Sequence, residues 1–250
     1  MSIFELKCCL SSLEEYNVDY YLIDGSIYGD LQNPFPKGVE TSAKAKKDLI
    51  SATLNDFEEM VKNPSDKSVY SPKLFNKYFK IYQEHKYPYT LYLTTIERLV
   101  VLKEILKNSR KMIAISKSSS NNDIFHSNMP DIAIFDKYTQ KEGISKVIRK
   151  KVSKDINTTF PVFDEFFKDL KFTIFYLRLA DYKNVLKVEL PYEASMAEIE
   201  EIASKLKKFS TNGYPYLLKK AHNDVVISDK NIKELINIAK VREKSGREML

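Results

Sequence analysis

Residues 2–26 have the sequence SIFELKCCLSSLEEYNVDYYLIDGS, which predicts a helix that leads directly into a strand. Ser2 and Glu5 have the spacing of a capping box, an arrangement that begins many helices. Residues 18–23 are rich in β-branched and aromatic side chains, which favour strands, and Asp24-Gly25-Ser26 ends the run as a turn. Farther along the chain, helical patterns alternate with short apolar runs, which indicates an α/β domain.

Two carboxylates meet in this unit if the connection is tight. A helix over residues 3–16 is about 20 Å long, and a strand over residues 18–24 is also about 20 Å long. The two elements then run antiparallel, so Glu5 returns beside Asp24 at the carboxyl edge of the sheet, where open α/β folds bind ligands. Carboxylates are the ligands that Mg²⁺ and Mn²⁺ prefer. The residues alone also allow simpler roles, a helix cap for Glu5 and a turn for Asp24.

The remaining patterns place the other elements. We expect helices over about residues 41–61, 71–85, 97–107, 196–209 and 217–222, and a final amphipathic helix from residue 228 or 229. We expect strands over residues 90–94, 111–116, 131–135, 172–179, 185–190 and 225–227. The strands at 172–179 and 185–190 form a predicted hairpin, in which Lys187 and Glu189 face away from the apolar side of the second strand. No repeat or linker divides the chain, so residues 1–250 are predicted to form one domain.

The composition restricts the class of protein. The 250 residues are 43% hydrophobic, 12% aromatic and 30% charged, which excludes a disordered or collagen-like chain. No apolar run approaches the roughly 20 residues of a membrane helix, and the first residues are not those of a signal peptide. We therefore expect a soluble cytoplasmic protein.

The cysteines and histidines limit the possible metal sites. Cys8 and Cys9 are neighbours, so they cannot form an ordinary disulfide framework, and we expect one in the core and the other half-buried. This usage fits a reducing compartment. The chain has only three histidines, so any metal site must depend on carboxylates.

Positive charge is concentrated in one segment. The net charge is +6, and residues 146–154 carry five cations and no acid. Two interpretations stay open for this basic strip: a surface that contacts phosphates, or a solvated helix face.

Further residues are candidates for the same sheet edge. Ser26 can hydrogen-bond a carboxylate or a phosphate. Lys117 follows a second buried strand, and if the two strands are parallel its ammonium reaches this edge and neutralises a phosphate. Tyr214 and His222 are eight residues apart, about two helical turns. The imidazole of His222 is suited to bind Mn²⁺ or to transfer a proton, whereas an ordinary surface histidine is the simpler interpretation.

Three segments, in this order, resemble the NurA family of nucleases. They are residues 5–26, which end in YLIDGS, residues 113–119 (IAISKSS) and residues 213–224 (GYPYLLKKAHND), the most specific of the three. The resemblance implies an RNase H-like mixed sheet flanked by helices, with a helical insertion at about residues 41–86. It also implies a homodimer that cleaves DNA ends during repair with Mn²⁺, or with Mg²⁺ as the alternative, beside a HerA-type hexameric ATPase.

The resemblance assigns roles to individual residues. Glu5 and Asp24 match metal-binding acids of the family, and His222 matches a metal ligand or proton shuttle. Tyr214 and Lys117 match residues that support the phosphate.

The chain departs from the family pattern at its beginning. NurA proteins carry an earlier Asp-Gly-Ser strand before the helix that holds the Glu, and here that Glu is residue 5. We expect a chain that is short at its N-terminus and lacks this strand, with weaker metal binding and slower cleavage as the consequence. Two other hypotheses stay open: a catalytically impaired subunit that binds the translocase and DNA without cleaving, and an α/β protein unrelated to either.

Overall fold

At the start of the chain α1 forms over Ile3–Glu15, close to the predicted bounds, whereas β1 covers only Tyr21–Asp24 and is shorter than the strand predicted over residues 18–24. The capping box between Ser2 and Glu5 begins α1. This computed structural model describes residues 2–32, 34, 43–78, 89–152, 160–225, 232 and 234.

The sheet has six strands among these residues, and β1 lies at one edge. Its neighbours in order are β2 (Met112–Ser116), β6 (Leu186–Leu190) and β5 (Lys171–Arg178), and both β3 (Gly143–Ile144) and β4 (Ile148–Lys151) pair with β5. β1 and β2 are parallel, so Asp24, the last residue of β1, and Lys117, which follows β2, lie at the same edge of the sheet. The predicted hairpin of β5 and β6 is confirmed, since these strands pair antiparallel.

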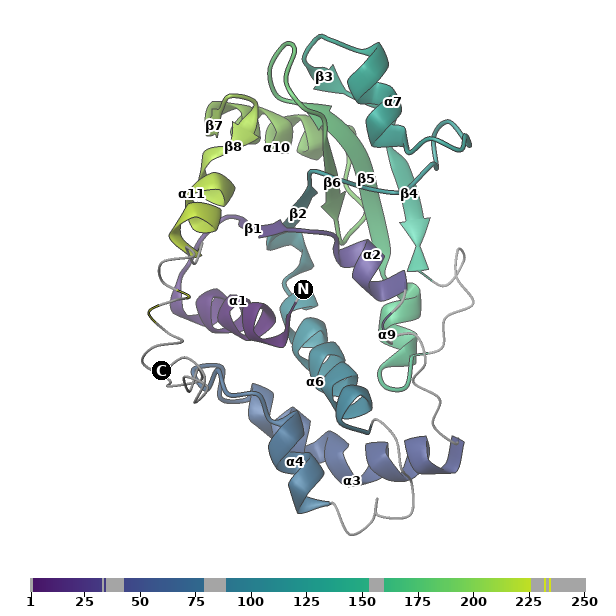
Figure 1. The fold of residues 1–250 in the computed structure, drawn as a ribbon, viewed down its shortest axis with the longest axis vertical. Coiled ribbons are helices and arrows are strands. Elements are labelled where there is room, and N and C mark those ends of the chain that lie inside the picture. Colours follow the sequence, from purple (N-terminus) through teal and green to yellow (C-terminus); the bar gives the residue numbers. More distant parts are fainter. Residues whose placement is uncertain are drawn as a thin grey trace, which may run out of the picture.

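Helices cover both faces of this sheet (Figure 1). On one face, α1 packs with α6 (Tyr89–Leu106), which also contacts α3 (Ala43–Val61) and α4 (Ser71–Lys77), and the core below them includes Met112 and Ala114 of β2. α10 (Met196–Lys208) covers the other face, and its core includes Ile113 and Ile115. All five residues of β2 are buried because alternate side chains enter the two cores.

Shorter elements complete the described fold. α2 (Ile27–Gln32) follows β1, and the 3₁₀ turn η1 (Ser109–Lys111) leads into β2. α7 (Asp131–Tyr138) and α9 (Asp164–Asp169) lie toward the β3–β4 side in Figure 1. β7 (Ser210–Thr211) and β8 (Tyr214–Pro215) form a small hairpin before α11 (Tyr216–Val225). Among the described helices, none is long and apolar enough to cross a membrane.

Two predicted strands are helical, so these predictions were wrong. Residues 90–94 belong to α6, where Leu93 and its neighbours on the buried side pack against α1 and α3. Residues 131–135 belong to α7, where the buried carboxylate of Asp131 accepts hydrogen bonds from the amides of Ile124 and Phe125. A run of about five mostly apolar residues does not distinguish a strand from a buried helix by periodicity alone, and tertiary contacts decide.

The basic strip is not a helix face. Residues 148–151 form β4, and its cations have acidic or carbonyl partners. The ammonium of Lys150 lies 2.7 Å from Asp123, Lys151 pairs with Asp169, and Arg149 donates to the carbonyl of Ala194 over 3.1 Å. Much of the charge in this segment is therefore neutralised within the fold, and Lys154 lies outside the described residues.

The cysteine prediction was half correct. Cys8 and Cys9 are free thiols, as expected, but both are half-buried rather than one of them lying in the core. Residues 79–88, which include the end of the helix predicted over 71–85, and residues 226 and 227 lie outside the described part of the chain. The predicted final helix lies outside it too, apart from residues 232 and 234. Val225, predicted to begin a strand, instead ends α11.

Candidate functional site

One cleft brings together Lys117, Tyr214 and His222, which the sequence proposes as site residues. The cleft has a volume of about 380 Å³ and is also lined by Asn184 and Lys219. Lys117 enters it from the end of β2, Tyr214 from β8, and His222 from α11. Residues from distant parts of the sequence therefore share one surface at the carboxyl end of β2.

The hairpin between β7 and β8 holds Tyr214 in this cleft. Its turn residues Asn212 and Gly213 have φ angles of 55° and 76°, in the left-handed region. A side chain at Gly213 would also approach within 2.5 Å of the Cβ atom of Lys183. Glycine is required at this position for both its backbone conformation and its close contact. α11 begins directly after the hairpin and places the exposed His222 in the cleft.

The aromatic ring of Tyr214 contacts a cation, while its hydroxyl is unpartnered. The ammonium of Lys117 lies 4.2 Å from the ring centroid, within the range of a cation–π interaction. The Tyr214 hydroxyl is buried and has no hydrogen-bond partner in the described structure. Burial, and then the negative charge of Asp24, raise the pKa of Tyr214 to about 12. This hydroxyl therefore keeps its proton at neutral pH.

Asp24 faces the same side of the sheet as the cleft. In the parallel register it lies beside Ile115, whose side chain belongs to the core below α10. Residues side by side on paired strands point to the same face, so Asp24 points toward the α10 and α11 side. Its effect on the pKa of Tyr214 agrees with this placement. The Asp24 carboxylate is exposed at the end of β1.

Glu5 belongs to the helix that covers the opposite face. Its Oε2 atom accepts a hydrogen bond from the Ser2 amide over 2.7 Å, and its own amide donates to Ser2 Oγ over 3.2 Å. These are the contacts of a capping box, the simpler of the two roles that the sequence allows.

A divalent cation needs a larger group of ligands than Glu5, Asp24 and His222 form here. Among the described residues, no three His, Cys, Asp or Glu side chains form a group that could hold a metal ion. Glu5, Asp24 and His222 therefore do not constitute a complete metal site in this structure, and their roles as ligands stay predictions.

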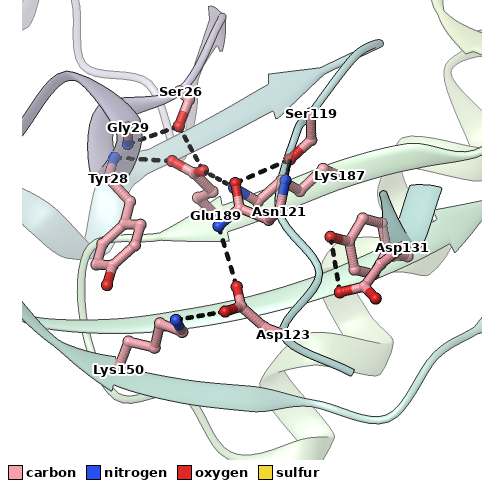
Figure 2. A network of polar contacts seen from close by, with 11 residues as sticks. Ser26, Tyr28, Gly29, Ser119, Asn121, Asp123, Asp131, Lys150, Lys187 and Glu189 are labelled. Atoms are coloured by element: carbon pink, nitrogen blue, oxygen red, sulfur yellow. Dashed lines mark hydrogen bonds and ion pairs between the residues drawn. The ribbon is translucent and has the colours of Figure 1, made fainter. Parts of the chain in front are cut away.

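Ser26 hydrogen-bonds the carboxylate of Glu189 rather than a carboxylate of the candidate site. The hydroxyl donates to Glu189 Oε1 over 2.6 Å and accepts from the Gly29 amide over 2.8 Å (Figure 2). Glu189 and Lys187 on β6 are fully buried, and the sequence assigned neither of them a role. The sequence feature that could have identified them is a pair of opposite charges two residues apart in an otherwise apolar strand.

Buried phenols and one thiol predict that the protein loses stability at alkaline pH. Burial raises the pKa of Cys9 from 9.0 to about 11, and that of Tyr92 and Tyr214 from 10.0 to about 12. Burial also raises the pKa of Tyr176. The folded chain holds these protons more tightly than the unfolded chain. The stability that these groups contribute to the fold is therefore complete below about pH 9 and decreases as the pH rises toward 12.

We expect urea denaturation to give a lower free energy of unfolding near pH 11 than near pH 8, and a smaller decrease for Tyr214→Phe. Equal values at both pH values would contradict this expectation.

The fold and the cleft define an α/β protein with a mixed sheet whose candidate site combines an acid, a lysine, a tyrosine and a histidine at a strand end. The chain matches the NurA domain over residues 1–227 and belongs to the NurA family.

Known relatives are longer than this chain. It is 30% identical over 274 residues to a protein of Methanocaldococcus jannaschii described as a probable DNA double-strand break repair nuclease NurA, and the match covers 100% of this chain and 66% of the relative. The chain is also similar to the crystal structure of the NurA nuclease from Sulfolobus solfataricus, with a TM-score of 0.68 and 24% identity over 96% of this chain and 64% of that one. A crystal structure of NurA bound to dAMP and manganese has a TM-score of 0.58 and 15% identity, over 97% of this chain and 75% of that one. The chain therefore spans slightly less than two thirds of the first two proteins.

Proposed function

We propose that this chain is a DNA nuclease that cleaves at DNA ends during end resection and repair. The observation that carries the proposal is the cleft that gathers Lys117, Tyr214 and His222, with Asp24 on the same face of the sheet. Membership of the NurA family and the description of the relative as a double-strand break repair nuclease support it. The proposal includes a single RNase H-like domain over residues 1–250, with a helical insertion at about 41–86, in the cytoplasm.

Each residue of the cleft has a chemical role in phosphodiester hydrolysis. The Lys117 ammonium would neutralise charge that develops on the scissile phosphate. Tyr214 would support the phosphate through its ring, which holds the Lys117 ammonium 4.2 Å from its centroid, since the Tyr214 hydroxyl is buried. The exposed imidazole of His222 would transfer a proton to or from the attacking or leaving oxygen.

We also propose that the activity depends on Mn²⁺, with Mg²⁺ as the alternative. Glu5, Asp24 and His222 are the proposed ligands, and a bound cation would supply Lewis acidity toward the phosphate. Support comes from the preference of these cations for carboxylate oxygens and from the relative that was crystallised with manganese. Among the described residues these three side chains do not form a group that could hold a metal ion, so adding and removing the cation is the test of this part of the proposal.

The direct test uses purified chain and end-labelled DNA. We expect Mn²⁺ to support shortening of the labelled strand, and EDTA to stop it. Single-stranded and double-stranded substrates, labelled at either end, would define the polarity and strand preference. Absence of cleavage with either Mn²⁺ or Mg²⁺ would reject the nuclease proposal for this chain.

A second candidate function is a DNA-processing subunit that binds a HerA-type hexameric ATPase and DNA without cleaving. The incomplete ligand group among the described residues favours it. This hypothesis predicts co-purification with the ATPase while calorimetry detects no binding of Mn²⁺. Both candidates include DNA and the HerA-type ATPase as partners, and both include a homodimer, which light scattering would test.

Lys117→Met is expected to lower the cleavage rate by about a hundredfold, because one preorganised positive donor at the reacting phosphate is lost. The matched control is Lys137→Met. Lys137 is also an exposed lysine over a tyrosine ring, at 5.1 Å from the Tyr138 centroid, but it lies on α7 and outside the cleft. Single-turnover cleavage of labelled DNA measures both variants. Equal cleavage rates for the two variants would show that Lys117 does not act in the candidate site.

A further inference from the structure

A buried ion pair lies behind the edge of the sheet that carries the candidate site. Lys187 and Glu189 on β6 are 1% and 0% exposed, and their Nζ and Oε1 atoms are 2.7 Å apart. Figure 2 shows the Glu189 carboxylate between the start of α2, which follows β1, and the loop that follows β2.

Glu189 binds Ser26 and the first turn of α2, the segment that follows Asp24. Its Oε1 atom accepts from Ser26 Oγ over 2.6 Å, and its Oε2 atom accepts from the Tyr28 amide over 2.9 Å. Ser26 Oγ in turn accepts from the Gly29 amide over 2.8 Å. Both carboxylate oxygens thus hold the segment that begins directly after Asp24.

Lys187 reaches the loop that follows Lys117. Its ammonium lies 3.4 Å from Asn121 Oδ1, and the Asn121 side chain donates to Asp123 over 3.0 Å. Asp123 pairs with Lys150 of β4 at 2.7 Å. The loop is therefore attached to β6 on one side and to β4 on the other.

Burying these two charges costs hydration free energy, which the burial of apolar side chains would not. A buried charge pair loses its hydration, so it often stabilises a fold no better than apolar side chains of the same size. What it supplies is directional contact, because each oxygen or ammonium hydrogen accepts or donates along a defined line. Here those directions lead to the two segments that follow Asp24 and Lys117.

We propose that Glu189, together with Lys187, is a positioning residue that sets the placement of Asp24 relative to Lys117. It acts through Ser26 and the first turn of α2, and through the loop around Asn121, rather than by touching DNA. The inference rests on the proposed function, because it assumes that Asp24 and Lys117 act on one substrate.

The test compares Glu189→Gln with a matched variant of another buried ion pair. Glu97 on α6 is 0% exposed, pairs with Lys7 at 2.6 Å, and accepts hydrogen bonds from the Tyr70 and Ser71 amides. Glu97→Gln therefore removes the same charge from a similar environment, within the helical layer and away from β6. Both variants are assayed at a temperature where circular dichroism shows them folded.

We expect Glu189→Gln to lower kcat by at least about tenfold while KM stays within about twofold, and Glu97→Gln to change neither by more than about twofold. Equal activity of the two variants, or losses that follow only their stabilities, would overturn the proposal.

Hydrogen exchange gives a readout that does not depend on activity. Glu189→Gln is expected to speed exchange of the Tyr28 and Gly29 amides and of the loop at residues 119–123 by at least about tenfold, whereas Glu97→Gln speeds exchange at Tyr70 and Ser71 instead. Unchanged exchange at Tyr28, Gly29 and residues 119–123 in Glu189→Gln would reject the positioning role. If the wild-type chain does not cleave DNA, the proposed function is rejected, and with it the role of Glu189 and Lys187 in placing Asp24 and Lys117 for catalysis.

Discussion

Asp24→Ala is expected to lower Mn²⁺-supported cleavage of end-labelled DNA by about a thousandfold or more, the scale of losses when one member of a cooperating catalytic set is removed. Asp24 has an exposed carboxylate at the end of β1, and its charge acts on Tyr214 in the cleft. Its removal eliminates the acid that lies on the same face of the sheet as the other site residues. Because the side chain is exposed, we expect the free energy of unfolding to change little.

Asp19→Ala is the matched control for this variant. Asp19 is also an exposed aspartate, but it precedes β1 and so lies toward the opposite end of the strand from Asp24. Its cleavage rate is expected to stay within about twofold of the wild type. Retention of more than a tenth of the activity by Asp24→Ala would show that Asp24 is not part of the catalytic set.

Glu97→Leu is expected to lower the free energy of unfolding by about 3–5 kcal/mol, the scale for a buried ion pair that loses one partner. The change leaves the ammonium of Lys7 buried at 3% exposure without its carboxylate. It also removes the acceptor of the Tyr70 and Ser71 amides, which Glu97 binds over 2.9 and 2.8 Å. The pair connects α1, α4 and α6, so the loss is expected to affect the whole helical layer.

Urea denaturation followed by circular dichroism measures this effect, with an unchanged m-value as the sign that only stability changed. Lys7→Met should cost less than Glu97→Leu, because the Glu97 carboxylate keeps its two amide donors. The control is Glu59→Leu, which breaks an exposed pair with Lys62 and should cost less than about 1 kcal/mol. Similar losses for Glu97→Leu and Glu59→Leu would contradict the prediction.

Local features of the fold were predictable from sequence because neighbouring residues determine them. The capping box of Ser2 and Glu5 depends on a few adjacent residues. The alternation of β6 was also visible, but the burial of Lys187 and Glu189 was not. That burial results from α2 and the loop around Asn121, which are distant in sequence.

In the candidate site, too, some features were predictable from the sequence and others only from the tertiary structure. The sequence by itself determined the residue types and their motifs, and the parallel pairing of β1 with β2 confirmed the condition under which Lys117 and Asp24 share one edge. Only the tertiary structure decided which face each acid occupies. The register with β2 turns Asp24 toward α10 and α11, whereas the apolar side of α1 holds Glu5 over the opposite face. The physical reason is that side chains alternate along a strand, so a residue's face depends on pairing with a strand far away in the sequence.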